Sequence, residues 1–174
     1  MKKILGIGNI FVLLSVVILS TATTSYAGDA PPNMASGLIM QLLTFEKSLM
    51  STGGDISIHV VGSTGLADEL KKSIGWKISK CTLSKVTESD ALPTSQVNIL
   101  VIADAKIVSK AIEYTRSNKV LSITNKPELV EKGISLGIGM NDSGGQSITL
   151  NMTASKKEGL DWNPAILKIA KAVK

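Results

Sequence analysis

Short apolar stretches alternate with amphipathic stretches along most of the chain. Residues 56–61 and 97–103 are largely apolar and β-branched and are bounded by turn residues, a pattern typical of buried strands in a parallel sheet. Residues 119–123 predict a third strand of this kind. Residues 76–86 predict a more amphipathic strand at a sheet edge, because three lysines lie along it.

The stretches between these strands carry apolar residues at three- and four-residue steps, the period of a helix. The widest stripe predicts one helix over residues 34–50. It includes Leu38, Leu42, Phe45 and Leu49. So wide a stripe is usual for a buried helix, and the alternative is a face that binds a partner or a second copy of the chain. Shorter helices are predicted over residues 66–74, 104–112 and 127–133.

The pattern changes from residue 134 onward. Residues 134–140 and 146–152 flank a turn-rich loop, so they predict an antiparallel hairpin. Gly159 ends a short helix, and Asn163-Pro164 begins a closing amphipathic helix, because asparagine caps helices and proline fits their first turn. The alternation of strands and helices before residue 134 predicts an α/β fold. We expect a three-layer sandwich with a mostly parallel sheet of order about 2-1-3-4-5, the terminal hairpin and the closing helix.

The first 27 residues have the order of a secretory signal peptide. Two lysines precede an apolar run over residues 4–19, and Ser25-Tyr26-Ala27 fits the small-x-small cleavage rule. The alternative is an uncleaved anchor helix, but the apolar run is shorter than the roughly 20 residues of a typical span. We therefore expect a signal peptide over 1–27, cleavage near Ala27, a flexible arm over 28–33, and one domain over 34–174 exported to the periplasm.

The net charge and the cysteine content exclude a nucleic-acid partner and an internal disulfide. The formal charge of +5 falls to +3 when Lys2 and Lys3 are removed, because residues 1–27 contain no acid. There is no run of lysine and arginine of the kind that favours nucleic-acid binding, so no nucleic-acid partner is expected. Cys81 is the sole cysteine and cannot form an internal disulfide. It is either a buried small hydrophobe or a free thiol able to bridge two chains.

Catalytic patterns are weak in this sequence. The single histidine, His59, lies in a predicted core strand, and G-x-S-x-G does not occur. One histidine and one cysteine cannot supply the usual zinc ligands, so no catalytic residue, metal or cofactor is expected. The acidic residues are scattered, and we interpret them as solvated surface.

One candidate ligand site remains, at the carboxyl ends of the predicted parallel strands. In open α/β sheets, ligands bind where the strand order reverses, which here lies between the turns after residues 61 and 103. Gly62-Ser63-Thr64-Gly65 is a partial echo of a phosphate loop, and the alternative is a strand–helix turn that needs glycine. The candidate residues are Gly62, Ser63, Thr64, Asp104, Lys106 and Asn125.

A series of short sequence pieces follows in a fixed order from residue 34 to residue 173. They are Phe45-Glu46-Lys47, Val60-Val61-Gly62, residues 97–102, residues 120–124, and the tail positions Asn151, Ala154, Gly159-Leu160 and Leu167-x-x-Ala170. Together with the export signal, this order resembles the YfiR family of periplasmic regulators. The family's Trp-Pro after the first helix and its paired cysteines are absent, so the chain resembles a divergent branch.

The resemblance implies a non-catalytic regulator. Family members such as YfiR hold down a membrane-bound diguanylate cyclase by contacting its periplasmic domain, which lowers cyclic di-GMP and biofilm formation. The implied partner is therefore the periplasmic domain of an inner-membrane diguanylate cyclase or sensor kinase, and a homodimer is implied as well. A periplasmic module that binds a small ligand is the second hypothesis, and an exported enzyme is the third.

Overall fold

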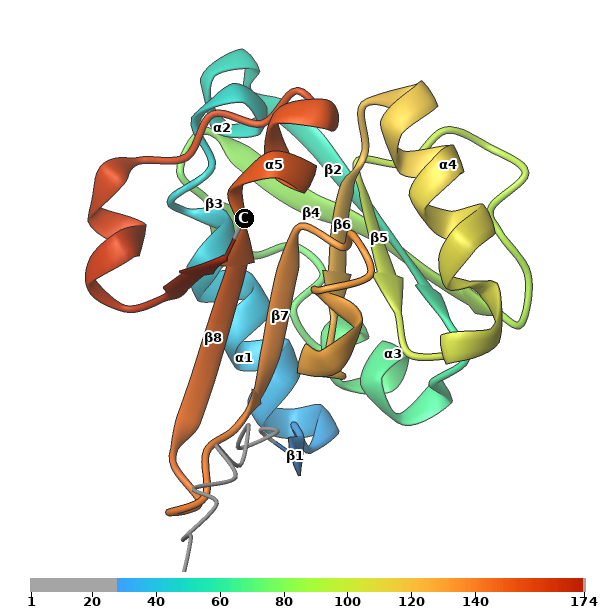
Figure 1. Cartoon of the computed structure of the whole chain (residues 1–174). Coiled ribbons are helices and arrows are strands. Elements are labelled where there is room, and N and C mark those ends of the chain that lie inside the picture. The colour runs from blue at the N-terminus through green and yellow to red at the C-terminus, as the bar shows by residue number, and fades with distance from the viewer. Residues whose placement is uncertain (1–27, 174) are drawn as a thin grey trace, which may run out of the picture.

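The strands of the domain form one nine-stranded mixed sheet (Figure 1). The structure is a computed structural model that describes residues 28–173. The predicted signal peptide, residues 1–27, lies outside the described residues. The strands are β1 (Gly28–Asp29), β2 (Gly54–Val61), β3 (Lys77–Ile78), β4 (Cys81–Ser89), β5 (Ile99–Ile102), β6 (Leu121–Thr124), β7 (Leu136–Met140), β8 (Gln146–Asn151) and β9 (Lys171–Val173). The helices are α1 (Pro32–Leu43), α2 (Lys47–Thr52), α3 (Thr64–Lys71), α4 (Val108–Asn118) and α5 (Met152–Lys157). Three 3₁₀ turns join them: η1 (Ala105–Ile107), η2 (Pro127–Leu129) and η3 (Pro164–Lys168).

The centre of the sheet confirms the predicted topology. The strand order is β3-β4-β2-β5-β6-β7-β8-β9, and β4, β2, β5, β6 and β7 are parallel to one another. Numbered in sequence order, these five strands have the expected order 2-1-3-4-5. The predicted hairpin is also present, because β7 and β8 pair antiparallel from Leu136↔Leu150 to Met140↔Gln146.

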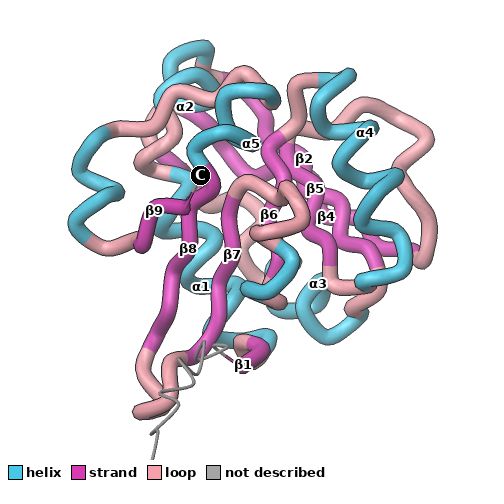
Figure 2. Tube along the Cα trace, viewed as in Figure 1, coloured by secondary structure: helices cyan, strands magenta, loops and turns pink. Residues whose placement is uncertain are grey.

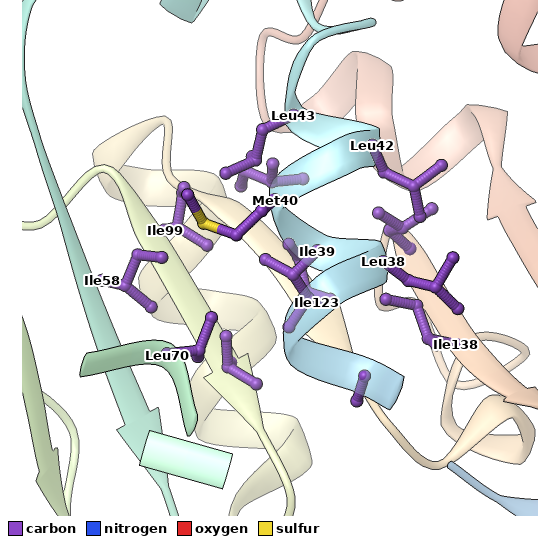
Figure 3. Packing of buried hydrophobic residues seen from close by; sticks show 14 of the residues in the cluster. Leu38, Ile39, Met40, Leu42, Leu43, Ile58, Leu70, Ile99, Ile123 and Ile138 are labelled. Carbon is purple, nitrogen blue, oxygen red and sulfur yellow. The ribbon is translucent and has the colours of Figure 1, made fainter. Parts of the chain in front are cut away.

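The central strands are buried because helices cover both faces of the sheet (Figure 2). Along β5, Ile99 and Val101 point into the core cluster that contains α1 and α3. Their neighbours Leu100 and Ile102 belong to the opposite cluster, which α4 supplies. This alternation places apolar side chains on both sides, as a continuously apolar strand requires. Figure 3 shows α1 presenting its side chains to Ile58, Ile99 and Ile123.

The helix predicted over residues 34–50 is interrupted. Helix α1 ends at Leu43 and α2 begins at Lys47. The C-terminal tail pairs with the backbone at the break: Asn163 N donates to Phe45 O at 2.7 Å, and Lys47 N donates to Asp161 O at 2.8 Å. A continuous helix would use these backbone groups internally, so pairing with the tail is incompatible with it.

The predicted closing helix is wrong beyond its first turn. Asn163 caps η3 as expected, because its side chain accepts a hydrogen bond from Ala165 N at 3.0 Å. The chain then leaves the helical path and forms β9, which pairs parallel with β8. The pairing supplies backbone partners to an otherwise open strand of the sheet, and this tertiary contact overrides the local helical pattern.

Two further segments differ from the sequence predictions. Residues 28–33, expected to be a flexible arm, are tied to the sheet: β1 pairs antiparallel with β7, and Ala30 N donates to Asn125 O at 3.1 Å. The strand predicted over residues 76–86 is a tight antiparallel hairpin of β3 and β4. Ser79 takes a left-handed conformation at its turn, with φ of 57°.

Candidate functional site

The carboxyl ends of β2 and β5 lie against each other, as the predicted ligand site requires. Gly62 follows β2 with φ of +77°, and a Cβ built on it would lie 2.7 Å from Asp104 Cβ. Asp104 follows β5, and Ala103 N donates to Val61 O at 2.9 Å beside it. Glycine is therefore needed at residue 62 both for the conformation and for this close approach.

Two of the predicted ligand-binding side chains already bind backbone groups of the chain. Ser63 Oγ accepts a hydrogen bond from Leu66 N at 3.3 Å and caps α3. Asp104 Oδ1 accepts one from Lys106 N at 2.8 Å and caps η1. Thr64 and the Lys106 side chain are exposed beside them. The capping role expected as the alternative for this turn is therefore present.

Asn125 lies one strand further along the same end of the sheet. Its Nδ2 donates to Ala30 O at 3.4 Å, so it holds the N-terminal segment rather than the turn after β2. Its Oδ1 is buried and has no hydrogen-bond partner among the described residues. Next to it, Lys126 forms an ion pair with Asp29, and the hydrogen bond to that carboxylate raises the pKa of Lys126.

His59 and Cys81 both lie inside the fold. The His59 ring is buried, with Nδ1 2.8 Å from Thr87 Oγ1 and Nε2 3.0 Å from Ala91 O. Because a carbonyl oxygen only accepts hydrogen bonds, Nε2 donates to Ala91 O, and in the neutral ring Nδ1 accepts from Thr87 Oγ1. The Cys81 side chain is buried. These positions agree with the packing roles expected for both residues.

The most strongly organised polar cluster surrounds Glu158, a residue that the sequence analysis counted as solvated surface. The side chain is 1% exposed, and it enters the domain where α5 ends. Its carboxylate accepts hydrogen bonds from Thr115 Oγ1 at 2.8 Å, Ser122 Oγ at 2.6 Å, Ser122 N at 3.1 Å and Ser135 Oγ. One carboxylate thus joins the tail to α4, to β6 and to the segment before β7.

The protonation of Glu158 is shifted by its surroundings. Burial raises the pKa of its carboxyl above the ordinary 4.5, and the hydrogen bonds from Ser122, Ser135 and Thr115 oppose that rise. The donors are neutral, so no cation compensates the buried charge. A titrating group of this kind is often functional, but its enclosure by side chains of the core makes it a structural anchor.

A second buried glutamate holds the same tail from the other side. Glu46 is fully buried at the break between α1 and α2. Its Oε1 accepts hydrogen bonds from Ser48 N at 3.2 Å, from Ser48 Oγ and from Asp161 N at 2.8 Å. Residues 158–161 are therefore fixed at one end by their own carboxylate and at the other by the carboxylate of Glu46.

The stripe proposed as a partner or dimer face lies mostly inside the domain. Leu38 and Leu42 are buried in the core between α1 and the sheet (Figure 3), so the surface role predicted for these two residues is wrong in this arrangement. Phe45 is half-buried and packs against the same core. The side chain of Leu49 lies outside the described part of the structure.

Two further features are absent from residues 28–173. No three His, Cys, Asp or Glu side chains among them are close enough to hold a metal ion. None of the helices in this part of the chain has the length and apolar character needed to cross a bilayer.

Comparison with known proteins assigns the family. A model of the YfiR/HmsC-like family matches residues 37–171, which is most of the described domain. The chain belongs to the YfiR/HmsC-like family. The match includes the tail that Glu158 and Glu46 hold, so the family's C-terminal signature corresponds to an anchored segment in this fold.

Structural comparison agrees on the fold. A solved structure described as a conserved domain protein from Vibrio cholerae O1 biovar El Tor superposes with a TM-score of 0.54 at 17% sequence identity. The match covers 83% of this chain and 60% of that chain, so this YfiR/HmsC-like domain spans less than two thirds of its structural relative. No individually curated protein matches the chain in sequence.

Replacing Glu158 by alanine should destabilise the domain by about 3 kcal/mol, because four buried donors would lose their acceptor. Urea unfolding of residues 28–174, followed by circular dichroism, measures the change. Glu131→Ala is the matched control: Glu131 is exposed, so its removal should alter the free energy of unfolding by no more than about 0.5 kcal/mol. Equal effects of the two substitutions would contradict the anchoring role.

The pH dependence of stability should also report on Glu158. A raised pKa means that the folded protein binds a proton more readily than the unfolded chain between 4.5 and the raised value. Relative to Glu158→Gln, which cannot titrate, the wild type should gain stability as the pH falls through this window and lose it as the pH rises. Unfolding free energies of both proteins across a pH series test this, and a constant difference would be evidence against it.

Proposed function

We propose that this chain is a non-catalytic regulatory protein of the periplasm that binds the periplasmic domain of an inner-membrane signalling protein. The observation that carries the proposal is the family match over residues 37–171. Because that match spans the sheet, the helices on both faces and the tail, the whole folded domain belongs to the regulator family.

The arrangement of the chemically reactive side chains supports a binding role. His59 uses both ring nitrogens in hydrogen bonds within the domain, and Cys81 is buried. Burial raises the pKa of the Glu158 carboxyl, and this side chain serves the core. These groups stabilise the domain, and such a rigid domain suits a protein whose task is to present a surface.

The partner in this proposal is a diguanylate cyclase or a sensor kinase of the inner membrane. The regulator binds one conformation of the partner's periplasmic domain more tightly than the other and so shifts the population of the partner. Restraint of a cyclase would lower cyclic di-GMP and surface attachment. A homodimer of the regulator belongs to the same proposal, by family resemblance.

Export places the protein beside that partner. The signal-like order of residues 1–27 supports secretion with cleavage near Ala27. Strand β1 begins at Gly28, directly after the proposed cleavage site.

Deleting the gene should raise cellular cyclic di-GMP and increase surface attachment, because the restraint on the cyclase is lost. Re-expression of the full chain should restore both. The matched control is a form that lacks residues 2–27 but keeps the complete described domain, and it should fail to restore because it stays in the cytosol. Unchanged cyclic di-GMP after deletion, or full restoration by the cytosolic form, would contradict this function.

A second candidate function is the binding of a small ligand at the carboxyl end of the parallel strands. One observation favours it: the buried Asn125 Oδ1 has no partner among the described residues, and a buried acceptor without a donor is costly. A ligand donor could satisfy it, with Thr64 and Lys106 exposed at the same end of the sheet. Ligand binding is compatible with regulation, because a ligand could tune contact with the partner.

A thermal-shift screen of nucleotides and amino acids tests this candidate. A ligand at about 100 times its Kd should stabilise the domain by about 2.7 kcal/mol, and Asn125→Ala should remove most of that gain. Asn118→Ala is the control, because Asn118 is exposed on α4. If no compound raises the melting temperature, or if both variants respond like the wild type, the ligand site is rejected.

A further inference from the structure

The edge of the sheet that contains β3 presents two large apolar side chains to solvent. We call residues 71–85 the basic edge segment; it runs from the end of α3 through the β3–β4 hairpin. Within it, Ile74 is 45% exposed and Trp76 is 60% exposed. Trp76 is the more exposed of the two tryptophans, because Trp162 is 7% exposed. Single exposed apolar side chains are common on protein surfaces; here two of them are separated by one glycine.

The backbone around these side chains is already satisfied within the chain. Ile74 N donates to Lys71 O at 3.1 Å, Gly75 N to Leu83 O at 2.8 Å, and Trp76 N to Ser73 O at 3.0 Å. Leu83 N in turn donates to Trp76 O at 3.0 Å. The segment can therefore leave water without exposing an unpaired N–H group at residues 74–76, which is the main cost of placing backbone in an apolar environment.

Open space lies beside Gly75, just before β3. A Cβ built on Gly75 would meet no atom within 4 Å. Gly75 lies between Ile74 and Trp76, so the exposed pair lies beside open space and is held by the fixed hairpin backbone.

The charge of the segment has a single sign. It contains five lysines and no acidic residue. Lys71 and Lys72 are neutralised by Asp68 and Glu69 of α3, at 2.8 Å and 2.7 Å. Lys77, Lys80 and Lys85 are exposed and form no ion pair among the described residues. Three uncompensated positive charges thus accompany Ile74 and Trp76.

We propose that the basic edge segment docks on an anionic phospholipid surface, with Trp76 and Ile74 among the lipid headgroups and the free lysines beside the phosphates. Tryptophan is enriched at membrane–water interfaces, and lysines near an anionic surface add electrostatic attraction. Tryptophan is enriched in protein–protein interfaces as well, but lysine is depleted there, so the three free lysines favour lipid over a protein partner.

Docking would extend the function proposed above. The choice of the inner membrane as the lipid surface rests on that proposed function. A regulator held on the bilayer searches a surface rather than a volume, so its effective concentration near a membrane-bound partner rises. Weak lipid affinity is sufficient for this purpose.

Vesicle sedimentation with residues 28–174 tests the proposal without any partner protein. We expect binding to vesicles of phosphatidylglycerol and phosphatidylethanolamine, weak binding to phosphatidylcholine, and loss of binding at high salt. Tryptophan emission should shift to shorter wavelength on binding, and Trp76→Ala should abolish both the shift and most of the binding. Leu167→Ala is the matched control: Leu167 is an apolar side chain that is 49% exposed on η3, and its loss should leave binding unchanged.

A second pair of variants separates the segment from overall charge. Lys77→Gln/Lys80→Gln should weaken binding about tenfold, whereas Lys110→Gln/Lys156→Gln, which removes two exposed lysines elsewhere, should leave it nearly unchanged. Equal losses in the two pairs, equal binding to neutral vesicles, or no vesicle binding would overturn the proposal. If the wild-type protein does not bind vesicles, and Trp76→Ala weakens binding to a purified partner domain, the segment is a protein contact. The gene-deletion experiment tests the proposed function independently, so the docking proposal can fail while the proposed function stands.

Discussion

The buried carboxylate of Glu158 is the interaction on which the arrangement of the C-terminal part depends. An ionised carboxylate in the core is costly unless every lone pair finds a donor, and here Thr115, Ser122 and Ser135 supply those donors. The donors come from three consecutive segments that precede Glu158 in the sequence by 43, 36 and 23 residues. The acid therefore acts as a hub that sets where the tail crosses the sheet.

The position of the tail then determines the neighbouring elements. Since Glu158 fixes the end of α5, Asp161 reaches Glu46 and interrupts the first helix, and the following residues place β9 beside β8. The hydrogen bonding of the buried Glu158 carboxylate is thus connected to the hydrogen bonding of the buried Glu46 carboxylate. This coupling explains why the tail is part of the domain that the family model matches, rather than an appendage to it.

Local sequence pattern was sufficient for the parts of the fold whose causes are local. The strands around Ile58, Ile99 and Ile138 were predictable because buried strands need near-continuous apolar side chains. The break after Leu43 was not predictable from its own neighbourhood, because its cause is backbone pairing with the distant tail, from Asn163 N to Phe45 O and from Lys47 N to Asp161 O. The closing helix failed for the same kind of reason: pairing with β8 outweighed a helical pattern that was correct for one turn.

The candidate sites also divide into features that the local sequence predicts and features that it does not predict. The close approach of Gly62 and Asp104 was foreseen from strand order, whereas the Glu158 cluster was missed because its donors are dispersed along the chain. A signal was present: Ser122 lies in a strand whose four residues are all buried, and a buried hydroxyl requires a partner. A search for acids able to reach buried hydroxyl groups would have indicated Glu158.

Both ends of the described chain lie within the sheet, with β1 beside β7 and β9 beside β8. A nascent polypeptide that has not yet released its last residues lacks both β9 and the glutamate that organises the core. Completion of the fold therefore has to wait for synthesis of the C-terminus. Under the proposed export, such a delay would be useful, because only a loosely folded precursor passes through a narrow translocation channel.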